Sequence, residues 1–432
     1  MAIPSAALEA RALPAAAAGT VAVVAPDDRC RYAGAIVRQG WRPVAVDLAP
    51  RLRPPAFWGP TLGPYAHRVE HRSSMYRTVR LLRALGVSAV VAGSVAGIAL
   101  AERIAAELQL AGADPETSLL RHDRGAQAAA LVQAGVPALR SVRTASLTEA
   151  LTWAERRALP AYVLAPAAAG VPVEPVVCER GLQISAAWPA MRREAARHAG
   201  DTHLVLTEHL PGRRYVVHSV SRLVDGQSDH VVTDVWAETR TSGGRLARTD
   251  LMNRHHLLTR ALHMYVLRAL DALGVVCGPV TSRIAYADER GPVLLSALAV
   301  PATSVADKAL REATGHDRLV DALDSVIPPA PAQLIPAPTG NRVVRVHLHP
   351  GHSGHIDPWT ARILRRLPTV AAVSEDLRSK TPATPPTGTE IVLSSSEPHA
   401  IEGDYRIIRA LERNCLYLAA ADSAPRPFER PT

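Results

Sequence analysis

The sequence predicts a multidomain protein that combines an α/β unit with α+β units. Its 432 residues exceed what one compact core holds, so two to three domains are expected. Over about residues 20–115, valine-rich strands alternate with helices, which is typical of a parallel sheet with crossover helices. Further along the chain, pairs of strands flank short turns, which indicates antiparallel hairpins mixed with helices.

The first unit opens with a strand, a helix and a second strand. The apolar run 21–25 predicts the first strand, and Gly40 ends the helix predicted over 33–39. Residues 43–47 predict the next strand. The later elements of this unit are a helix over 76–85, a strand over 88–93 and a helix over 98–108.

The middle block, residues 116–327, mixes helices with antiparallel strands. One turn at Asp225-Gly226 and another at 288–291 each join two predicted strands. The predicted helices cover residues 119–135, 148–157 and 257–273. The predicted strands cover residues 161–164, 203–207, 215–220, 231–236, 283–286 and 292–298.

A proline-rich segment follows this block. Five prolines from Pro328 to Pro338 predict a linker over residues 328–339. The sequence then predicts a small α+β domain over residues 340–421. Its expected elements are strands over 342–349 and 390–394 and helices over 358–367 and 403–413. The two ends, 1–19 and 422–432, are expected to be a flexible Ala-rich segment and a polar tail.

Composition narrows the classes of function. All but two of the 49 basic residues are arginine and the net charge is +9, yet aromatic residues make up only 4%. A nucleic-acid site needs a basic face with stacking aromatic rings, so we expect no nucleic-acid partner. The densest basic run lies in an acid-poor helical segment and comprises Arg68, Arg72, Arg77, Arg80 and Arg83.

Hydropathy and cysteine usage indicate the compartment. No apolar stretch of 18 residues is free of charge, so we expect no membrane span. The N-terminal segment lacks the basic start and continuous apolar centre of a signal peptide. The cysteines form no C-x-x-C pair, which argues against a disulfide framework or a thiolate zinc site and favours a cytoplasmic protein. They are Cys30, Cys178, Cys277 and Cys415.

Six segments, taken in order, resemble phrases of the ATP-grasp superfamily. They are residues 91–102, 120–124, 163–166, 206–212, 278–284 and 292–299. Residues 120–124 read L-R-H-D-R where the family has R-R-D-K, and residues 163–166 read V-L-A-P where it has V-V-K-P. The resemblance is to the amino-acid and carboxylate–amine ligases of small-peptide and natural-product biosynthesis.

This resemblance implies a fold, cofactors and a reaction. The fold is an ATP-grasp-like one, with an N-terminal parallel α/β pre-ATP-grasp domain and a small C-terminal α+β domain. The implied cofactors are ATP and Mg²⁺. In the implied reaction a carboxylate is phosphorylated, and an amine then attacks the acyl phosphate.

The resemblance also places the residues that would bind phosphate. The family's first phosphate-binding lysine falls on Arg124, which keeps the charge in a planar guanidinium. The second falls on Ala165, which has no charge. The glycine-rich loop falls on residues 167–175, where Gly170 remains. Two prolines in this loop remove N–H donors, and Glu174 adds negative charge near the phosphates.

The nucleotide and metal positions are altered in the same comparison. Glu208 keeps the family's hinge glutamate, but the glutamate of the G-x-E-Y phrase falls on Arg214. The two metal-ligand carboxylates fall on Arg283 and Ser296. A cation and a hydroxyl do not supply the oxygen ligands that Mg²⁺ needs, so we expect a site that does not run the standard reaction. The cofactor-binding candidates, if ATP or another anion binds, are Arg124, Gly170, Glu208, Arg214 and Arg283.

These replacements leave three hypotheses open. The first is a non-catalytic partner of an active ATP-grasp ligase or of another enzyme of the same pathway. The second is a carboxylate–amine ligase with a rearranged site, in which Arg124 and Arg283 bind phosphate and Glu208 binds the nucleotide. The third is a cleft that binds another anionic small molecule without ATP, through Arg124, Arg214 and Arg283. Dimers are common in the family, so a homodimer is a further candidate.

Four histidines within nine residues form a separate candidate site. Imidazoles at this density bind zinc in other proteins. The alternative interpretation is a strand end and a solvated loop in the C-terminal domain. We favour the loop, because the βα context of metallo-hydrolases is missing. The weak metal candidates are His347, His349, His352 and His355.

Overall fold

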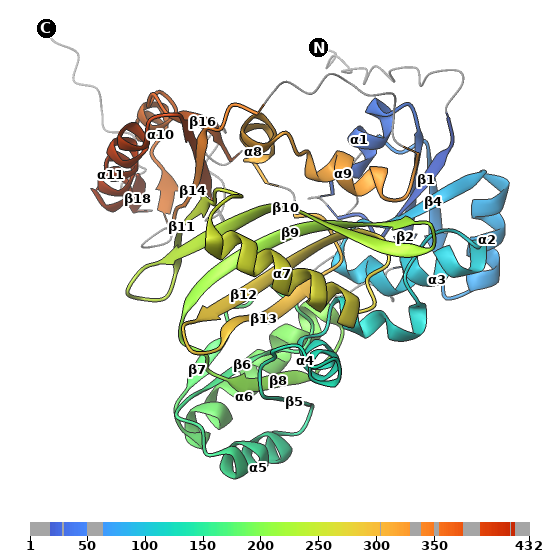
Figure 1. Cartoon of the computed structure of the whole chain (residues 1–432), viewed down its shortest axis with the longest axis horizontal. Helices are drawn as coiled ribbons and strands as arrows, with labels where there is room; N and C mark the ends of the chain where they lie inside the picture. The colour runs from blue at the N-terminus through green and yellow to red at the C-terminus, as the bar shows by residue number, and fades with distance from the viewer. Residues whose placement is uncertain are drawn as a thin grey trace, which may run out of the picture.

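The computed structural model describes residues 18–27, 30–49, 64–302, 304–328, 338–349, 354–374, 389–414 and 416–419. A large antiparallel sheet lies at the centre, with a parallel sheet at one end and a smaller antiparallel sheet below it (Figure 1). The predicted fold class, α/β combined with α+β, is confirmed.

The N-terminal unit is a four-stranded parallel sheet in the order β3-β2-β1-β4. Every residue of β1 is buried, because helices cover both faces of the sheet. The predicted start, a strand, a helix and a strand, is confirmed. The elements are β1 (Thr20–Val24), α1 (Tyr32–Arg38), β2 (Arg42–Leu48), β3 (His67–His71) and β4 (Val87–Ala92).

Helices from two distant parts of the chain cover this sheet. The helices α2 (Met75–Ala84) and α3 (Ile98–Leu108) pack on one face. On the other face, α1 lies beside α9 (Arg318–Asp324), whose Leu323 shares an apolar cluster with Val23. A helix from much later in the chain therefore completes the core of the first unit.

The small antiparallel sheet has the order β5-β8-β6-β7 and is backed by two helices. One of these helices, α6, lies in a stretch where the sequence patterns indicated no helix. Its glycine start and the internal Pro189 obscure its helical pattern. The elements are β5 (Ser141–Thr144), α5 (Leu147–Arg157), β6 (Tyr162–Pro166), β7 (Val176–Cys178), α6 (Gly181–Ala199) and β8 (Leu204–Glu208).

The large sheet has eight strands in the order β13-β12-β9-β10-β11-β14-β17-β16. The helix α7 (Leu257–Ala272) packs with α4 (Arg124–Gln133) on one face, over an apolar cluster that includes Tyr215 and Ile284. The strands are β9 (Arg213–Val224), β10 (Gln227–Arg240), β11 (Leu246–Leu251), β12 (Gly278–Ala287), β13 (Gly291–Leu298), β14 (Arg342–His347), β16 (Val370–Val373) and β17 (Glu390–Ser395).

This sheet continues across the predicted linker, because β11 pairs antiparallel with β14. Arginine side chains also join β11 to the helix α11 (Pro398–Asn414). Arg248 donates to Asp250 and to Glu402, and its guanidinium lies 4.7 Å from the ring of Tyr405. Arg409 approaches the same ring at 5.2 Å.

The remaining elements lie between the sheets and at the C-terminal end. The helix predicted over 403–413 begins earlier, at Pro398. These elements are the 3₁₀ helices η3 (Val95–Gly97) and η4 (Pro115–Arg121), α8 (Asp307–Thr314), β15 (Gly354–Ile356), α10 (Pro358–Leu364), α11 (Pro398–Asn414) and β18 (Tyr417–Ala419).

Several predicted segments lie outside the described residues. These are residues 1–17 of the N-terminal segment, 329–337 of the linker and all of the tail. The division into domains stays a prediction. Among the helices that the structure describes, none combines the length and apolarity of a membrane span.

Candidate functional site

The first predicted cation, Arg124, is bound by the loop that follows β6. Asp123 caps the start of α4 by accepting from the Ala126 N–H at 2.9 Å, which places Arg124 in the first turn. The Arg124 guanidinium donates to the carbonyl oxygens of Pro166 at 2.6 Å and Ala168 at 2.9 Å, and to that of Ala169 at 3.2 Å. Its hydrogen-bonding capacity is therefore largely used within the protein.

Main-chain bonds close the same loop onto the segment before α4. The Arg124 N–H donates to the carbonyl of Ala167 at 2.8 Å, and the Ala169 N–H donates to that of His122 at 2.8 Å. Asp123 and Ala168 form an antiparallel bridge. The N–H of Ala169 is therefore not free to face a ligand.

The end of the loop is packed on both sides. A Cβ atom on Gly170 would lie 2.5 Å from Cγ2 of Val95, so only glycine fits against the N-terminal unit there. Beyond it, Glu174 is 80% exposed, and its Oε2 lies 3.7 Å from a guanidinium nitrogen of Arg240 on β10. The loop thus spans from the N-terminal unit to the large sheet.

A second arginine stands near Arg124 without a partner of opposite charge. Arg283 lies on β12, is exposed, and pairs in register with Ser296 on β13. Burial and the nearby charge of Arg283 lower the pKa of Arg124 to about 10. Within the described part of the chain, the Arg283 side chain makes no hydrogen bond or ion pair.

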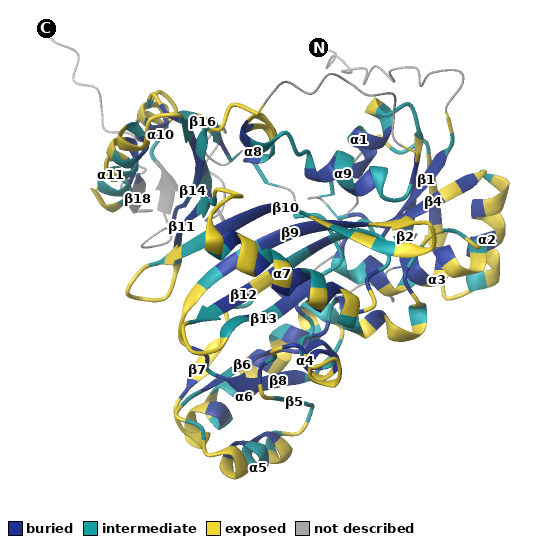
Figure 2. Cartoon of the chain, viewed as in Figure 1, coloured by how far each residue is buried: buried dark blue, intermediate teal, exposed yellow. Residues whose placement is uncertain are grey.

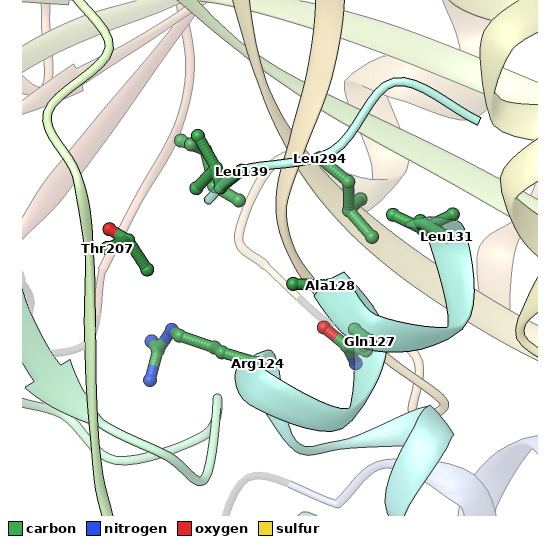
Figure 3. Close-up of a pocket in the computed structure, with 8 residues that line it drawn as sticks. Arg124, Gln127, Ala128, Leu131, Leu139, Thr207 and Leu294 are labelled. Atoms are coloured by element: carbon green, nitrogen blue, oxygen red, sulfur yellow. The ribbon is translucent and has the colours of Figure 1, made fainter. Parts of the chain in front are cut away.

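Behind Arg124 lies a small cavity between α4, β8 and β13 (Figure 3). Its volume is about 10 Å³, which corresponds to about one water molecule. Gln127 stiffens one wall, because its amide accepts from the Ala297 N–H at 2.9 Å and donates to the Ala297 carbonyl at 2.7 Å. The lining residues are Arg124, Gln127, Ala128, Leu131, Leu139, Thr207, Leu294 and Leu295.

The hinge glutamate is fully engaged inside the protein. Glu208 ends β8 and is 5% exposed. One carboxylate oxygen accepts from the Arg140 N–H at 3.0 Å and from Arg290 at 2.7 Å, and the other accepts from Arg140 Nε at 2.9 Å. Burial alone would raise the pKa of Glu208, but the bonds from Arg290 and Arg140 hold it below its usual value.

The fourth predicted residue, Arg214, lies on β9 and is partly buried. Its Nη2 donates to the Leu210 carbonyl at 3.2 Å. Burial and the charge of Arg240 lower its pKa, although Glu238 opposes this. Glu238 itself is bound by Arg240 at 3.0 Å, so the acid closest to Arg214 is already paired.

The sequence patterns did not indicate a buried cluster around Asp234. Its carboxylate, which is fully buried, lies 2.6 Å from Nδ1 of His218 and accepts from Trp236 at 2.5 Å and from Arg318 at 2.6 Å. Burial opposes this charge, but Arg318 and His218 hold the pKa of Asp234 well below its usual value. Arg318 comes from α9, so no local sequence pattern could signal the cluster.

Comparison with known proteins connects this geometry with other structures. No family model matches the chain, and no curated protein matches it in sequence. The crystal structure of an L-amino acid ligase from Bacillus licheniformis matches with a TM-score of 0.70 and 14% identity, over 91% of this chain and 98% of the ligase. The chain has an ATP-grasp fold.

Two further ATP-grasp enzymes have the same arrangement. An N5-carboxyaminoimidazole synthetase from Staphylococcus aureus, complexed with ADP, matches with a TM-score of 0.67 and 11% identity over 90% of this chain and 97% of that one. A biotin carboxylase domain from Hydrogenobacter thermophilus, in complex with MgADP and bicarbonate, matches with a TM-score of 0.59 and 14% identity. This match covers 91% of this chain and 89% of the domain.

The ATP-grasp fold implies Mg²⁺–ATP, but the residues present do not fit it. The residues that the sequence resemblance places at the metal carboxylates, Arg283 and Ser296, lie opposite each other in the sheet. Among the described residues, no group of three or more His, Cys, Asp or Glu side chains is arranged to hold a metal ion. The phosphate cation, Arg124, is held by carbonyls of the loop itself.

The described histidines of the second candidate site have separate partners. Nδ1 of His347 lies 3.3 Å from Glu390, whereas Nε2 of His349 lies 2.6 Å from the carbonyl of Leu246. His352 and the side chain of His355 lie outside the described residues. The structure does not bring His347 and His349 together at one site.

A serine, a histidine and an aspartate form another hydrogen-bonded series. Ser221 Oγ lies 2.6 Å from Nδ1 of His230, whose Nε2 lies 3.1 Å from Asp271. Ser221 is 0% exposed, whereas the Asp271 side chain is 69% exposed. A nucleophilic serine must reach a substrate, so this series links β9, β10 and α7 rather than forming a hydrolase site.

Proposed function

We propose that this chain is a non-catalytic ATP-grasp-fold protein that acts as the partner of an active carboxylate–amine ligase, or of another enzyme of the same natural-product pathway. The observation that carries the proposal is that the end of β6 and the loop after it bind Arg124, through the carbonyls of Pro166, Ala168 and Ala169. A loop that binds its own phosphate cation presents carbonyl oxygens where an ATP-binding loop presents N–H groups.

The chemistry of acyl phosphate formation supports the same proposal. The transferred phosphoryl group needs fixed positive charge and metal ions to neutralise the negative charge that develops on it. In this chain the metal positions hold Arg283 and Ser296, and Glu208 is bound by two arginines. The fold of a ligase is thus retained, while the groups that the reaction needs are replaced or occupied.

Titration of ATP into the purified protein, with and without Mg²⁺, tests the proposal. We expect no heat and no thermal shift at millimolar ATP. Mg²⁺-dependent binding at micromolar ATP would favour a ligase with a rearranged site, and release of ADP with amino acids and carboxylates would then be measured. The partner role requires that an active ligase of the same pathway changes its rate when this protein is added in equal amount.

One observation favours a second candidate function, a cleft for another anionic small molecule. Arg283 is exposed, lies near Arg124, and has no acidic partner within the described residues. Two adjacent cations of this kind repel each other, and a bound anion relieves the repulsion. Titration with inorganic phosphate and with succinate, both without Mg²⁺, measures this binding. R283Q should abolish it, whereas R260Q, at an exposed arginine on α7, should leave it unchanged.

A further inference from the structure

The outward face of α2 carries three of the five arginines that form the densest basic run of the sequence. Thr78, Val79 and Leu82 point into the N-terminal core, so the rest of the helix faces outward. Tyr76 is 77% exposed and Leu81 is 38% exposed. Between and beside them lie three exposed arginines, and the face is defined by Tyr76, Arg77, Arg80, Leu81 and Arg83.

The segment of the chain that forms this face contains no acidic residue. From Arg72 to Ala101 the sequence contains no Asp or Glu, although the whole chain has 40 acidic residues against 49 basic ones. Arg77 and Arg80 make no ion pair within the described residues, and Arg83 donates only to the main-chain carbonyl of Glu107 at 2.7 Å. The positive charge of the face is therefore available to a partner.

The residue types of this face are those that dominate protein–protein binding. Tyrosine and arginine are enriched among the residues that contribute most to interface energy. A large exposed tyrosine with arginines around it provides a flat apolar contact and charge-assisted hydrogen bonds together. We propose that the outward face of α2 is a docking surface for an acidic protein segment that carries apolar side chains.

Other classes of partner fit this face less well. A nucleic-acid surface needs several aromatic rings along a basic groove, and α2 offers one ring on a ten-residue helix. A membrane-binding helix inserts its apolar side into lipid, but the apolar side of α2 is buried against β3, β4 and α3. Charge complementarity thus favours an acidic protein segment.

The docking surface on α2 is separate from the candidate site around Arg124. The helix α2 lies at the outer edge of the N-terminal unit, whereas α4, which begins at Arg124, lies beside the small sheet (Figures 1 and 2). Figure 2 shows the outer side of α2 as exposed. A segment bound to α2 leaves the cleft accessible, so this inference holds whether or not the cleft binds ATP.

The test uses the full chain and a fluorescein-labelled peptide of 14 residues, composed of Glu, Asp and Leu with leucines at helical spacing. Fluorescence anisotropy at 50 mM NaCl measures its Kd. We expect the charge-reversed variant R77E/R80E/R83E to raise the Kd at least tenfold, and Y76A to raise it about three- to tenfold. The matched control is R192E/R193E/R197E, which changes the net charge equally at exposed positions of α6 and should raise the Kd less than twofold.

Two results would overturn the proposal. Equal weakening by the α2 and α6 variants would show that only the net charge of the protein attracts the peptide. Tighter binding of a 20-base-pair DNA duplex or of phosphatidylserine vesicles, lost in R77E/R80E/R83E, would assign the face to nucleic acid or membrane instead. If the triple variant does not fold, R80Q replaces it, with an expected two- to threefold rise in Kd and no rise for R193Q.

Discussion

Two arginines of this protein have their charges compensated in different ways. The side chain of Arg318, the first residue of α9, is 4% exposed and lies 2.6 Å from the buried carboxylate of Asp234. The side chain of Arg124 donates only to main-chain carbonyls and lies near a second arginine, Arg283. The first charge is neutralised by a directly bonded opposite charge. The second is compensated by carbonyl dipoles and in part by the nearby charge of Asp123, which Arg143 also binds.

The two arginines therefore have different roles: Arg318 stabilises the fold, whereas Arg124 keeps a charge that can attract an anion. A buried ion pair with all its hydrogen bonds holds elements in one arrangement, and here it fixes α9 to the large sheet. A cation that is solvated by carbonyls keeps its net charge and still attracts anions. The ion pair of Asp234 with Arg318 should therefore contribute strongly to stability, and the bonds of Arg124 to its loop should contribute little.

The largest expected effect on stability is at the buried ion pair of Asp234 with Arg318. D234N removes the charge that compensates Arg318, so we expect the free energy of unfolding to fall by about 3–5 kcal/mol. Urea unfolding followed by tryptophan fluorescence measures it. D229N, at an exposed position of the same strand, should change the free energy by less than about 0.5 kcal/mol. The double variant D234N/R318M should recover part of the loss, and equal losses for D234N and D229N would contradict the comparison.

His218, which lies against Asp234, should also make the free energy of unfolding depend on pH. Burial, and then the charge of Arg318, lower the pKa of His218, so the folded protein keeps it neutral where the unfolded chain takes up a proton. Its contribution to stability is present above about pH 6.5 and falls as the pH is lowered from 7 to 5. In H218N the slope of unfolding free energy against pH should decrease, by at most about 1.4 kcal/mol per pH unit. The exposed His255 provides the control, H255N, and an unchanged slope in H218N would refute the assignment.

A smaller effect on the free energy of unfolding is expected at Arg124. R124M breaks three hydrogen bonds to loop carbonyls but also removes a charge that burial and Arg283 oppose, so we expect a loss of about 1–2 kcal/mol. Hydrogen exchange should increase at residues 167–170, because the loop loses its attachment. R124K tests whether one point charge is enough to hold it. A loss as large as that of D234N would remove the distinction between the two regions.

The smallest effect is expected at the outer end of the loop. Glu174 is 80% exposed and lies 3.7 Å from Arg240, so E174Q should change the free energy of unfolding by less than about 0.5 kcal/mol. Thermal unfolding at low and high salt measures it. A salt-dependent loss above 1 kcal/mol would show that this contact, rather than Arg124, closes the loop.

Features that depend on local sequence patterns could be predicted from the sequence. The valine-rich strands and amphipathic helices of the first unit are correct to within a few residues, and the ATP-grasp resemblance is confirmed as a fold. These features depend on short segments whose side chains alternate or repeat with a fixed period. In the structure Arg283 and Ser296 pair across β12 and β13, while their assignment to the metal positions stays a prediction.

The features that the sequence did not predict depend on distant contacts. No pattern near Asp234 indicates that Arg318 lies against it, and α9 shows no sign that its partners are residues of the first strand. The attachment of Arg124 to its loop depends on the main-chain conformation of residues 166–169. The sequence suggested altered chemistry at Arg124, but the occupied guanidinium became visible only in the structure.

The pairing of β11 with β14 has a consequence for synthesis of the chain. Until β14 is made, β11 is an edge strand with unpaired main-chain groups, which can pair with another chain. The ribosome adds the residues from Met252 to Asn341 in roughly 5 to 20 seconds, at about 5–20 residues per second. For that time the nascent protein presents an open sheet edge, so aggregation during translation should depend on how fast this stretch is made.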